Sequence, residues 1–164
     1  MNKKTFIWVG IGYIFLCILI GAAVWLLRDS LKYVISDDVE LENIVFNQTA
    51  PLDVKSGEDF VVEMQITNTS SEAQELDSID IYTSYLDGVA VKRIDPPNVS
   101  EREVNFGDHY FNYEFKREIP AHQTLAVKFL MTAVKTGDFS GDVYVCVNSP
   151  TLCNIYQIQA IIGK

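Results

Sequence analysis

The feature that most constrains this chain is an apolar run near its N-terminal end. It extends from Thr5 to Leu27, contains no charged residue and lies between Lys4 and Arg28. As an α-helix, at about 1.5 Å per residue, the run would be roughly 35 Å long, which exceeds the hydrocarbon core of a bilayer, about 30 Å thick. It is also longer than the apolar region of a cleaved signal peptide, about 7 to 15 residues. The sequence therefore predicts a transmembrane helix that is retained as a signal anchor.

The residues after this run have a polar, strand-like pattern and suffice for one ordinary domain. We expect a cytoplasmic N-terminus at residues 1–4, the helix at 5–27, a juxtamembrane linker at 28–37 and an extracytoplasmic domain at 38–164. Basic residues on the two sides of the helix are nearly balanced. The predicted orientation therefore depends on acidic residues beyond the helix and on a cysteine pair, which is typical of an oxidising compartment. The predicted location is the cell membrane, crossed once.

The charge balance excludes one class of partner. The chain has 13 Lys and Arg residues against 22 Asp and Glu residues, a net charge of −9. Nucleic-acid binding requires a basic surface that neutralises phosphates, so we expect no nucleic-acid partner. A peripheral interaction with anionic lipid is disfavoured for the same reason. Contact with the lipid bilayer is therefore expected only through the N-terminal helix.

Apolar residues alternate with polar ones in several segments of the domain. Within residues 58–67, Phe60, Val62, Met64 and Ile66 share one face of an extended chain, which is the period of a half-buried strand. The same alternation recurs at residues 79–85, 111–115 and 125–133, with turn signals between the segments. This spacing predicts an all-β fold, an antiparallel immunoglobulin-like β-sandwich preceded by one transmembrane helix.

The longest gap between predicted strands is Asp95 to Asp108, where no convincing alternation occurs. Long irregular segments on a rigid sheet often carry binding residues, which makes this gap a candidate binding loop. The alternative interpretation is an ordinary crossover between the two sheets of the sandwich, and we expect this one.

Two segments carry a family resemblance. Residues 51–58, with a turn glycine at Gly57, precede an alternating strand that ends in Thr67-Asn68-Thr69-Ser70. This order resembles the opening of extracytoplasmic immunoglobulin-like modules of the CARDB (cell-adhesion-related) type, which usually have Gly where Ser70 stands. Residues 119–125 are similar to the Pro-x-Gly turn of such folds, again without the Gly. The resemblance implies a fold and a non-enzymatic role, and it identifies no ligand.

Cys146 and Cys153 flank a segment with the turn chemistry of a hairpin loop. The apolar rows of the two flanking strands leave both cysteines on the opposite, outer face, where facing positions lie within disulfide reach. We therefore predict a structural disulfide, which by the chain-entropy model would contribute about 2.5 kcal/mol. Free thiols or a ligand role are the alternatives. The pair lacks the Cys-x-x-Cys spacing of a redox site. A copper site is disfavoured because the loop contains no histidine, and His109, His122 and Met131 lie on other segments.

Enzyme signatures are missing from the sequence, which contains no Gly-x-Ser-x-Gly, no His-Glu-x-x-His and no phosphate-binding glycine loop. We therefore name no catalytic, cofactor-binding or metal-binding residue and expect no cofactor. Asp77 and Asp80 lack the spacing of a calcium loop, so we interpret them as solvated residues at strand edges. The aromatic residues of 110–115 suit sugar stacking, but their alternation favours a buried strand face.

Together these observations predict a non-enzymatic protein. We expect a protein-interaction or assembly module in the cell envelope, whose partners are other membrane or envelope proteins. The alternative is a surface domain that binds a ligand, either carbohydrate or metal. Sequons begin at Asn47, Asn68 and Asn98 and would permit glycosylation in a eukaryotic or archaeal host.

Overall fold

The computed structural model describes residues 41–105 and 109–164. The predicted transmembrane helix at 5–27 and the linker at 28–37 lie outside these residues. Within the described part of the chain, no helix has the length and apolar character needed to cross a membrane.

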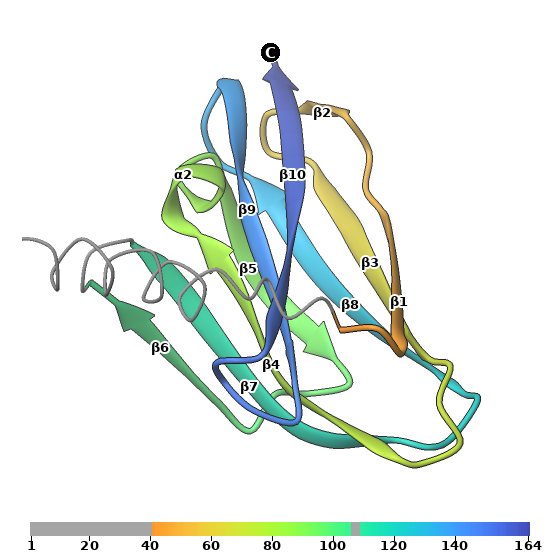
Figure 1. The fold of residues 1–164 in the computed structure, drawn as a ribbon. Helices are drawn as coiled ribbons and strands as arrows, with labels where there is room; N and C mark the ends of the chain where they lie inside the picture. The colour runs from red at the N-terminus through yellow and green to blue at the C-terminus, as the bar shows by residue number, and fades with distance from the viewer. Residues whose placement is uncertain (1–40, 106–108) are drawn as a thin grey trace, which may run out of the picture. The chain divides into compact units, whose positions relative to one another are not determined.

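The described residues form two β-sheets, as predicted for a β-sandwich (Figure 1). Sheet A has four strands in the order β1-β3-β8-β5, and sheet B has six in the order β2-β10-β9-β4-β7-β6. Neighbouring strands are antiparallel except β2 and β10, which are parallel. The strands of sheet A are β1 (Ile44–Thr49), β3 (Asp59–Asn68), β8 (Thr124–Ala133) and β5 (Val89–Asp95). Those of sheet B are β2 (Asp53–Lys55), β10 (Cys153–Gly163), β9 (Gly137–Val147), β4 (Gln74–Tyr82), β7 (Tyr110–Ile119) and β6 (Ser100–Val104).

The inward rows of the two sheets form one hydrophobic core. The predicted row on β3 is buried, and so are the alternating residues of β8 from Val127 to Ala133. Sheet B contributes Ile79 and Ile81 from β4, together with alternating residues of β7, β9 and β10. The Tyr113 ring of β7 meets the Phe129 ring of β8 edge to face, with centroids 5.4 Å apart, which connects the two layers. The sequence prediction of a sandwich core is therefore confirmed.

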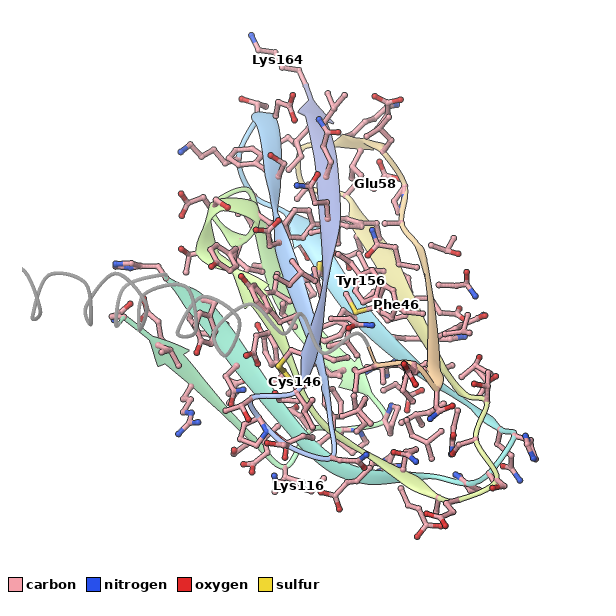
Figure 2. The ribbon with its side chains drawn as sticks, in the orientation of Figure 1. Phe46, Glu58, Lys116, Cys146, Tyr156 and Lys164 are labelled. Carbon is pink, nitrogen blue, oxygen red and sulfur yellow. A yellow bond between two sulfur atoms is a disulfide. The ribbon has the colours of Figure 1, made fainter. Side chains whose placement is uncertain are left out.

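A second aromatic contact joins the two sheets near one edge. Phe46 of β1 and Tyr156 of β10 lie next to each other, as Figure 2 shows, with ring centroids 4.0 Å apart and planes 24° apart. Both side chains are half-buried and pack against the core. They cover the core where the first strand of sheet A approaches sheet B.

The prediction of one strand over residues 79–85 is wrong at its end. Strand β4 stops at Tyr82, and Thr83–Leu86 form a single helical turn, α2. The chain leaves sheet B here and enters sheet A as β5, so the extended conformation cannot continue. Tyr85 is nevertheless fully buried, with its hydroxyl 3.9 Å from the Met131 sulfur. A buried residue in a helical turn thus reproduced the apolar spacing of a strand.

The gap between Asp95 and Asp108 contains a strand that the sequence did not reveal. Strand β6 pairs with β7 at the edge of sheet B, and four of its residues are exposed. Its exposed residues are Ser100 to Glu103, all polar or charged, so β6 lacks the apolar alternation that marks the other strands. The chain passes from β5 in sheet A to β6 in sheet B, as the crossover interpretation required.

Candidate functional site

The outer faces of the two sheets differ in character. The outer face of sheet A carries two ion pairs at the surface, with Lys92 Nζ 2.7 Å from Asp59 Oδ1 and Lys128 Nζ 3.3 Å from Glu63 Oε2. Such pairs are typical of a solvated surface and contribute little stability. Sheet B instead presents aromatic and buried polar side chains on its outer face. The candidate site lies there.

A hollow of about 310 Å³ opens on the outer face of sheet B, and we call it the tyrosine pocket. Its lining consists of Asp80, Tyr82, Tyr110, Tyr144, Pro150, Thr151 and Cys153. The central strand β4 supplies the carboxylate and one ring, β7 and β9 supply one ring each, and the loop between β9 and β10 supplies one wall. The pocket thus depends on the register of three adjacent strands.

The tyrosine rings form a row across these strands. Tyr82 on β4 lies directly opposite Tyr110 on β7, with ring centroids 6.2 Å apart. On its other side, the Tyr144 ring of β9 stacks at 5.6 Å with planes 17° apart. The hydroxyl oxygens of Tyr82 and Tyr144 are 3.3 Å apart and share a hydrogen bond. Tyr82 therefore has an aromatic neighbour on each side, and its hydroxyl converges with that of Tyr144.

Asp80 lies in the pocket with only 8% of its surface exposed. On β4 it is opposite both Asn112 of β7 and Tyr144 of β9. The Asn112 amide donates a hydrogen bond to Asp80 Oδ1 at 2.6 Å. Burial raises the pKa of the Asp80 carboxyl, and this effect outweighs the opposing influence of Asn112, the Ser78 hydroxyl and the Arg102 charge. The pocket therefore contains a carboxylate that is poorly solvated in its charged form.

The interpretation of Asp77 and Asp80 as solvated edge residues is wrong. Strand β4 lies inside sheet B, between β9 and β7, and both carboxylates are buried. Asp77 sits at a bulge in the pairing of β4, where Lys116 forms an ion pair with it. The hydrogen bond from Lys116 to Asp77 is the main cause of the raised pKa of Lys116. Lys116 thus compensates the charge of Asp77, whereas Asp80 faces the pocket.

The predicted disulfide between Cys146 and Cys153 is present. The two residues are directly paired on β9 and β10, with Cα atoms 4.0 Å apart. Cys146 is fully buried and is labelled in Figure 2, and Cys153 lines the pocket. The loop that the bond closes carries Pro150 and Thr151, which form the adjoining wall. The disulfide therefore fixes one side of the tyrosine pocket.

A second, smaller hollow of about 170 Å³ adjoins the first and shares Tyr82 with it. Its other lining residues are Ser84, Ser140, Gly141, Asp142 and Gln157. A Cβ at Gly141 would lie 2.9 Å from the Ser84 hydroxyl oxygen and 3.1 Å from the Tyr82 Cβ. Glycine is thus required where α2 packs closely against β9. The two hollows together extend the site along the face of sheet B.

The aromatic residues of 110–115 divide between the two faces of β7. Tyr113 and Phe115 are buried in the core and Phe111 packs against it, as the strand-face interpretation predicts. Tyr110 is in the opposite phase and lines the pocket. Sequence reasoning therefore placed three of these residues correctly but missed the site. The signal that was available is the polar phase of β4, since Asp80 and Tyr82 alternate with Ile79 and Ile81.

The residues considered for copper are separated. His109 precedes β7, His122 lies in the turn after β7, and Met131 is buried in the core. Over residues 41–105 and 109–164, no group of three or more His, Cys, Asp or Glu residues is arranged to hold a metal ion.

Neither a family model nor a curated protein matches this chain. Several solved structures resemble it at low identity. A cohesin module from a family 33 glycoside hydrolase of Clostridium perfringens is 11% identical, and the match covers 73% of this chain and 96% of that chain at a TM-score of 0.43. A CARDB domain from Pyrococcus furiosus, solved in complex with di-metal ions, is 12% identical over 73% of this chain and 87% of that chain, with a TM-score of 0.43. A protein that catalyses macrocyclization in alchivemycin A biosynthesis is 10% identical over 74% and 89%, with a TM-score of 0.46. These similarities assign neither a family nor a ligand.

Proposed function

We propose that this protein is a non-catalytic binding module that is anchored in the cell membrane and captures another membrane or envelope protein through the tyrosine pocket. The observation that carries the proposal is the composition of one outward face. Three tyrosines surround a buried carboxylate where a sandwich sheet ordinarily presents solvated polar residues. Tyrosine is enriched at protein interfaces because its ring supplies apolar contact area and its hydroxyl a hydrogen bond.

The chemistry of the lining suits binding. Its titratable groups are one carboxylate and three phenols, and its cysteine is held in a disulfide. Asp80 already accepts a hydrogen bond from Asn112, which orients the carboxylate. A preorganised polar group among aromatic rings gives specificity to an interface without bond making.

The face of sheet B is a better docking surface than its edges. The edge strand β6 carries Glu101, Arg102 and Glu103, all exposed, and the short edge strand β2 carries the exposed Asp53 and Lys55. Charged residues on an edge strand oppose the addition of a further strand. We therefore assign partner capture to the face that holds the pocket.

The apolar run at residues 5–27 supplies the anchor in this proposal. A module held at the membrane meets partners in the same membrane at a raised effective concentration. A moderate affinity at the pocket is then sufficient for stable association. This arrangement places the module outside the cytoplasm, where its disulfide is maintained.

Copurification of the full-length protein tests the proposal. After gentle detergent extraction, the wild type should carry a stoichiometric membrane-protein companion. The double variant Tyr110→Ala/Tyr144→Ala should lose it. The matched control is Gln65→Ala/Thr67→Ala on the outer face of sheet A, which should keep it. A wild-type protein without a companion, or a companion retained by the pocket variant, would contradict the proposal.

A further inference from the structure

We infer that the tyrosine pocket receives one basic side chain of the partner, a lysine ammonium or an arginine guanidinium, which pairs with Asp80. This inference rests on the proposed binding function and names the chemical group that the pocket recognises. It is drawn from the charge, the rings and the size of the pocket.

The first support is the position of the charge. Asp80 is the carboxylate among the residues that line the tyrosine pocket, and it is buried. A buried carboxylate is stabilised most by a charged donor, because charge-assisted hydrogen bonds are the strong ones. Asn112 supplies a neutral donor to one oxygen. A cation entering the pocket would compensate for the solvation that Asp80 loses on burial.

The charges around Asp80 are not all favourable to a cation. Arg102, opposite Asn112 on β6, lies close enough for its positive charge to act on Asp80. It is exposed and forms no ion pair among the described residues. Asp77 is paired with Lys116, and Glu114 of β7 accepts a hydrogen bond from Ser100. Asp142 lines the adjoining hollow. Arg102 is thus the competitor of an incoming cation.

The tyrosines favour a cation over a sugar. Phenol oxygens accept hydrogen bonds from ammonium and guanidinium groups, a contact that needs no open ring face. A pyranose needs a flat, open ring face on which to stack. Tyr82 has ring neighbours at 5.6 and 6.2 Å on its two sides, which restricts its faces. Its hydroxyl and that of Tyr144 converge instead.

The size of the hollow agrees with one side chain. Its volume of about 310 Å³ is at the lower end of the range for small-molecule sites. Pro150 and Thr151 form a wall against which the aliphatic stem of a lysine or arginine can pack. The smaller hollow next to it leaves room for the neighbouring residues of the partner.

The test uses the full-length protein in detergent micelles and blocked amino acids as probes. Nα-acetyl-lysine amide and Nα-acetyl-arginine amide should shift the NMR signals of the pocket tyrosines saturably. Nα-acetyl-norleucine amide, which has a similar stem without the charge, should not. N-acetylglucosamine serves as the sugar probe. Binding of norleucine as strong as that of lysine, saturable binding of the sugar without lysine, or no binding of either basic probe would overturn the inference.

Two variants locate the interaction. Asp80→Asn should weaken lysine binding at least about tenfold, the scale of one charge-assisted hydrogen bond. Arg102→Gln, on the exposed edge strand, should strengthen it about two- to threefold, since a partly screened repulsion is removed. Should Asp80→Asn not fold, Arg102→Gln still decides, because unchanged lysine affinity in this variant contradicts pairing at Asp80.

The failure of this inference can be told apart from the failure of the proposed function. If the membrane companion depends on Tyr110 and Tyr144 but basic probes do not bind, the pocket is an interface for a different chemical group. If the companion does not depend on Tyr110 and Tyr144 and the basic probes do not bind, both proposals are contradicted.

Discussion

Asp80 and Asn112 lie directly opposite each other on β4 and β7, and the Asn112 amide donates to the Asp80 carboxylate at 2.6 Å. Both residues are 8% exposed. This pair makes it possible for a charged carboxylate to remain inside the sheet. It therefore connects the stability of sheet B with the chemistry of the tyrosine pocket.

Replacement of Asn112 by alanine should destabilise the protein. The carboxylate of Asp80 would lose its amide donor while it remains buried, which costs about 1 to 3 kcal/mol for an unsatisfied polar group. Urea unfolding followed by tyrosine fluorescence or circular dichroism measures the change, since residues 41–164 contain no tryptophan. The control Gln65→Ala, on the exposed face of sheet A, should change the free energy of unfolding by less than about 0.5 kcal/mol. Equal effects of the two substitutions would contradict the role assigned to Asn112.

Asp80 should also give the protein a characteristic pH dependence. Its pKa is raised on folding, so the folded state binds the proton more readily than the unfolded state does. For an acid of this kind, stability falls as the pH rises from the unfolded pKa through the folded pKa, and is regained on acidification. The variant Asp80→Asn has no titrating group at this position and so loses this contribution to the pH dependence of stability. Its stability relative to the wild type should therefore be greatest at neutral pH and should decrease toward about pH 4.

Other carboxylates do not obscure this comparison. The pKa values of Asp59 and Glu63 are lowered, chiefly by hydrogen bonds from Lys92 and Gln65 respectively, and these groups have the opposite effect on acidification. They are present in both proteins, so the difference between wild type and variant isolates residue 80. Thermal unfolding followed by circular dichroism at several pH values provides the measurement. A difference that does not change with pH would refute the assignment.

Asn68 should be structural and should remain unmodified. It is fully buried, and its amide donates to the carbonyls of Glu72 at 2.7 Å and Ile119 at 3.0 Å. Asn68→Ala should therefore destabilise the protein by about 1 to 3 kcal/mol, since the buried Ile119 carbonyl loses the Asn68 amide as a donor. In a glycosylating host, mass analysis should find no glycan at Asn68 in the folded protein. The exposed Asn47 on β1 is the matched control for both measurements.

The disulfide should support both stability and binding. The double variant Cys146→Ala/Cys153→Ala should lose about 2.5 kcal/mol by the chain-entropy model. Because the loop between the two strands carries Pro150 and Thr151, the variant should also bind the companion less tightly. Alkylation before and after reduction, followed by mass analysis, counts the protected thiols. Labelling of both residues without reduction would show that the bond is absent in the isolated protein.

The sandwich was predictable because its strands bury one face each. Phe60, Met64 and Phe129 lie on inward rows that the alternation alone identifies, and the two cysteines occupy the outer phase that strand parity assigned. The helical turn at Tyr85 was not predictable from period alone, because it buries an apolar residue at strand spacing. Strand β6 was hidden for the opposite reason, since its exposed residues have no apolar row.

The site was harder to foresee than the fold. Asp80, Tyr82 and Tyr144 occupy positions that a sequence reader assigns to solvent, because they alternate with core residues. Only strand order shows that β4 lies between β7 and β9, so that these side chains meet. Strand pairing is a long-range property, and a single sequence carries little information on it.

Site-specific photo-crosslinking in the native membrane tests the central claim most directly. A benzophenone amino acid placed at Tyr144 in the full-length protein should yield a discrete crosslinked adduct with a membrane or envelope protein. The same group at Gln65, on the outer face of sheet A, should not. An adduct from Gln65 alone, equal adducts from both positions, or none from Tyr144 would contradict the assignment of the tyrosine pocket as the surface that binds the partner.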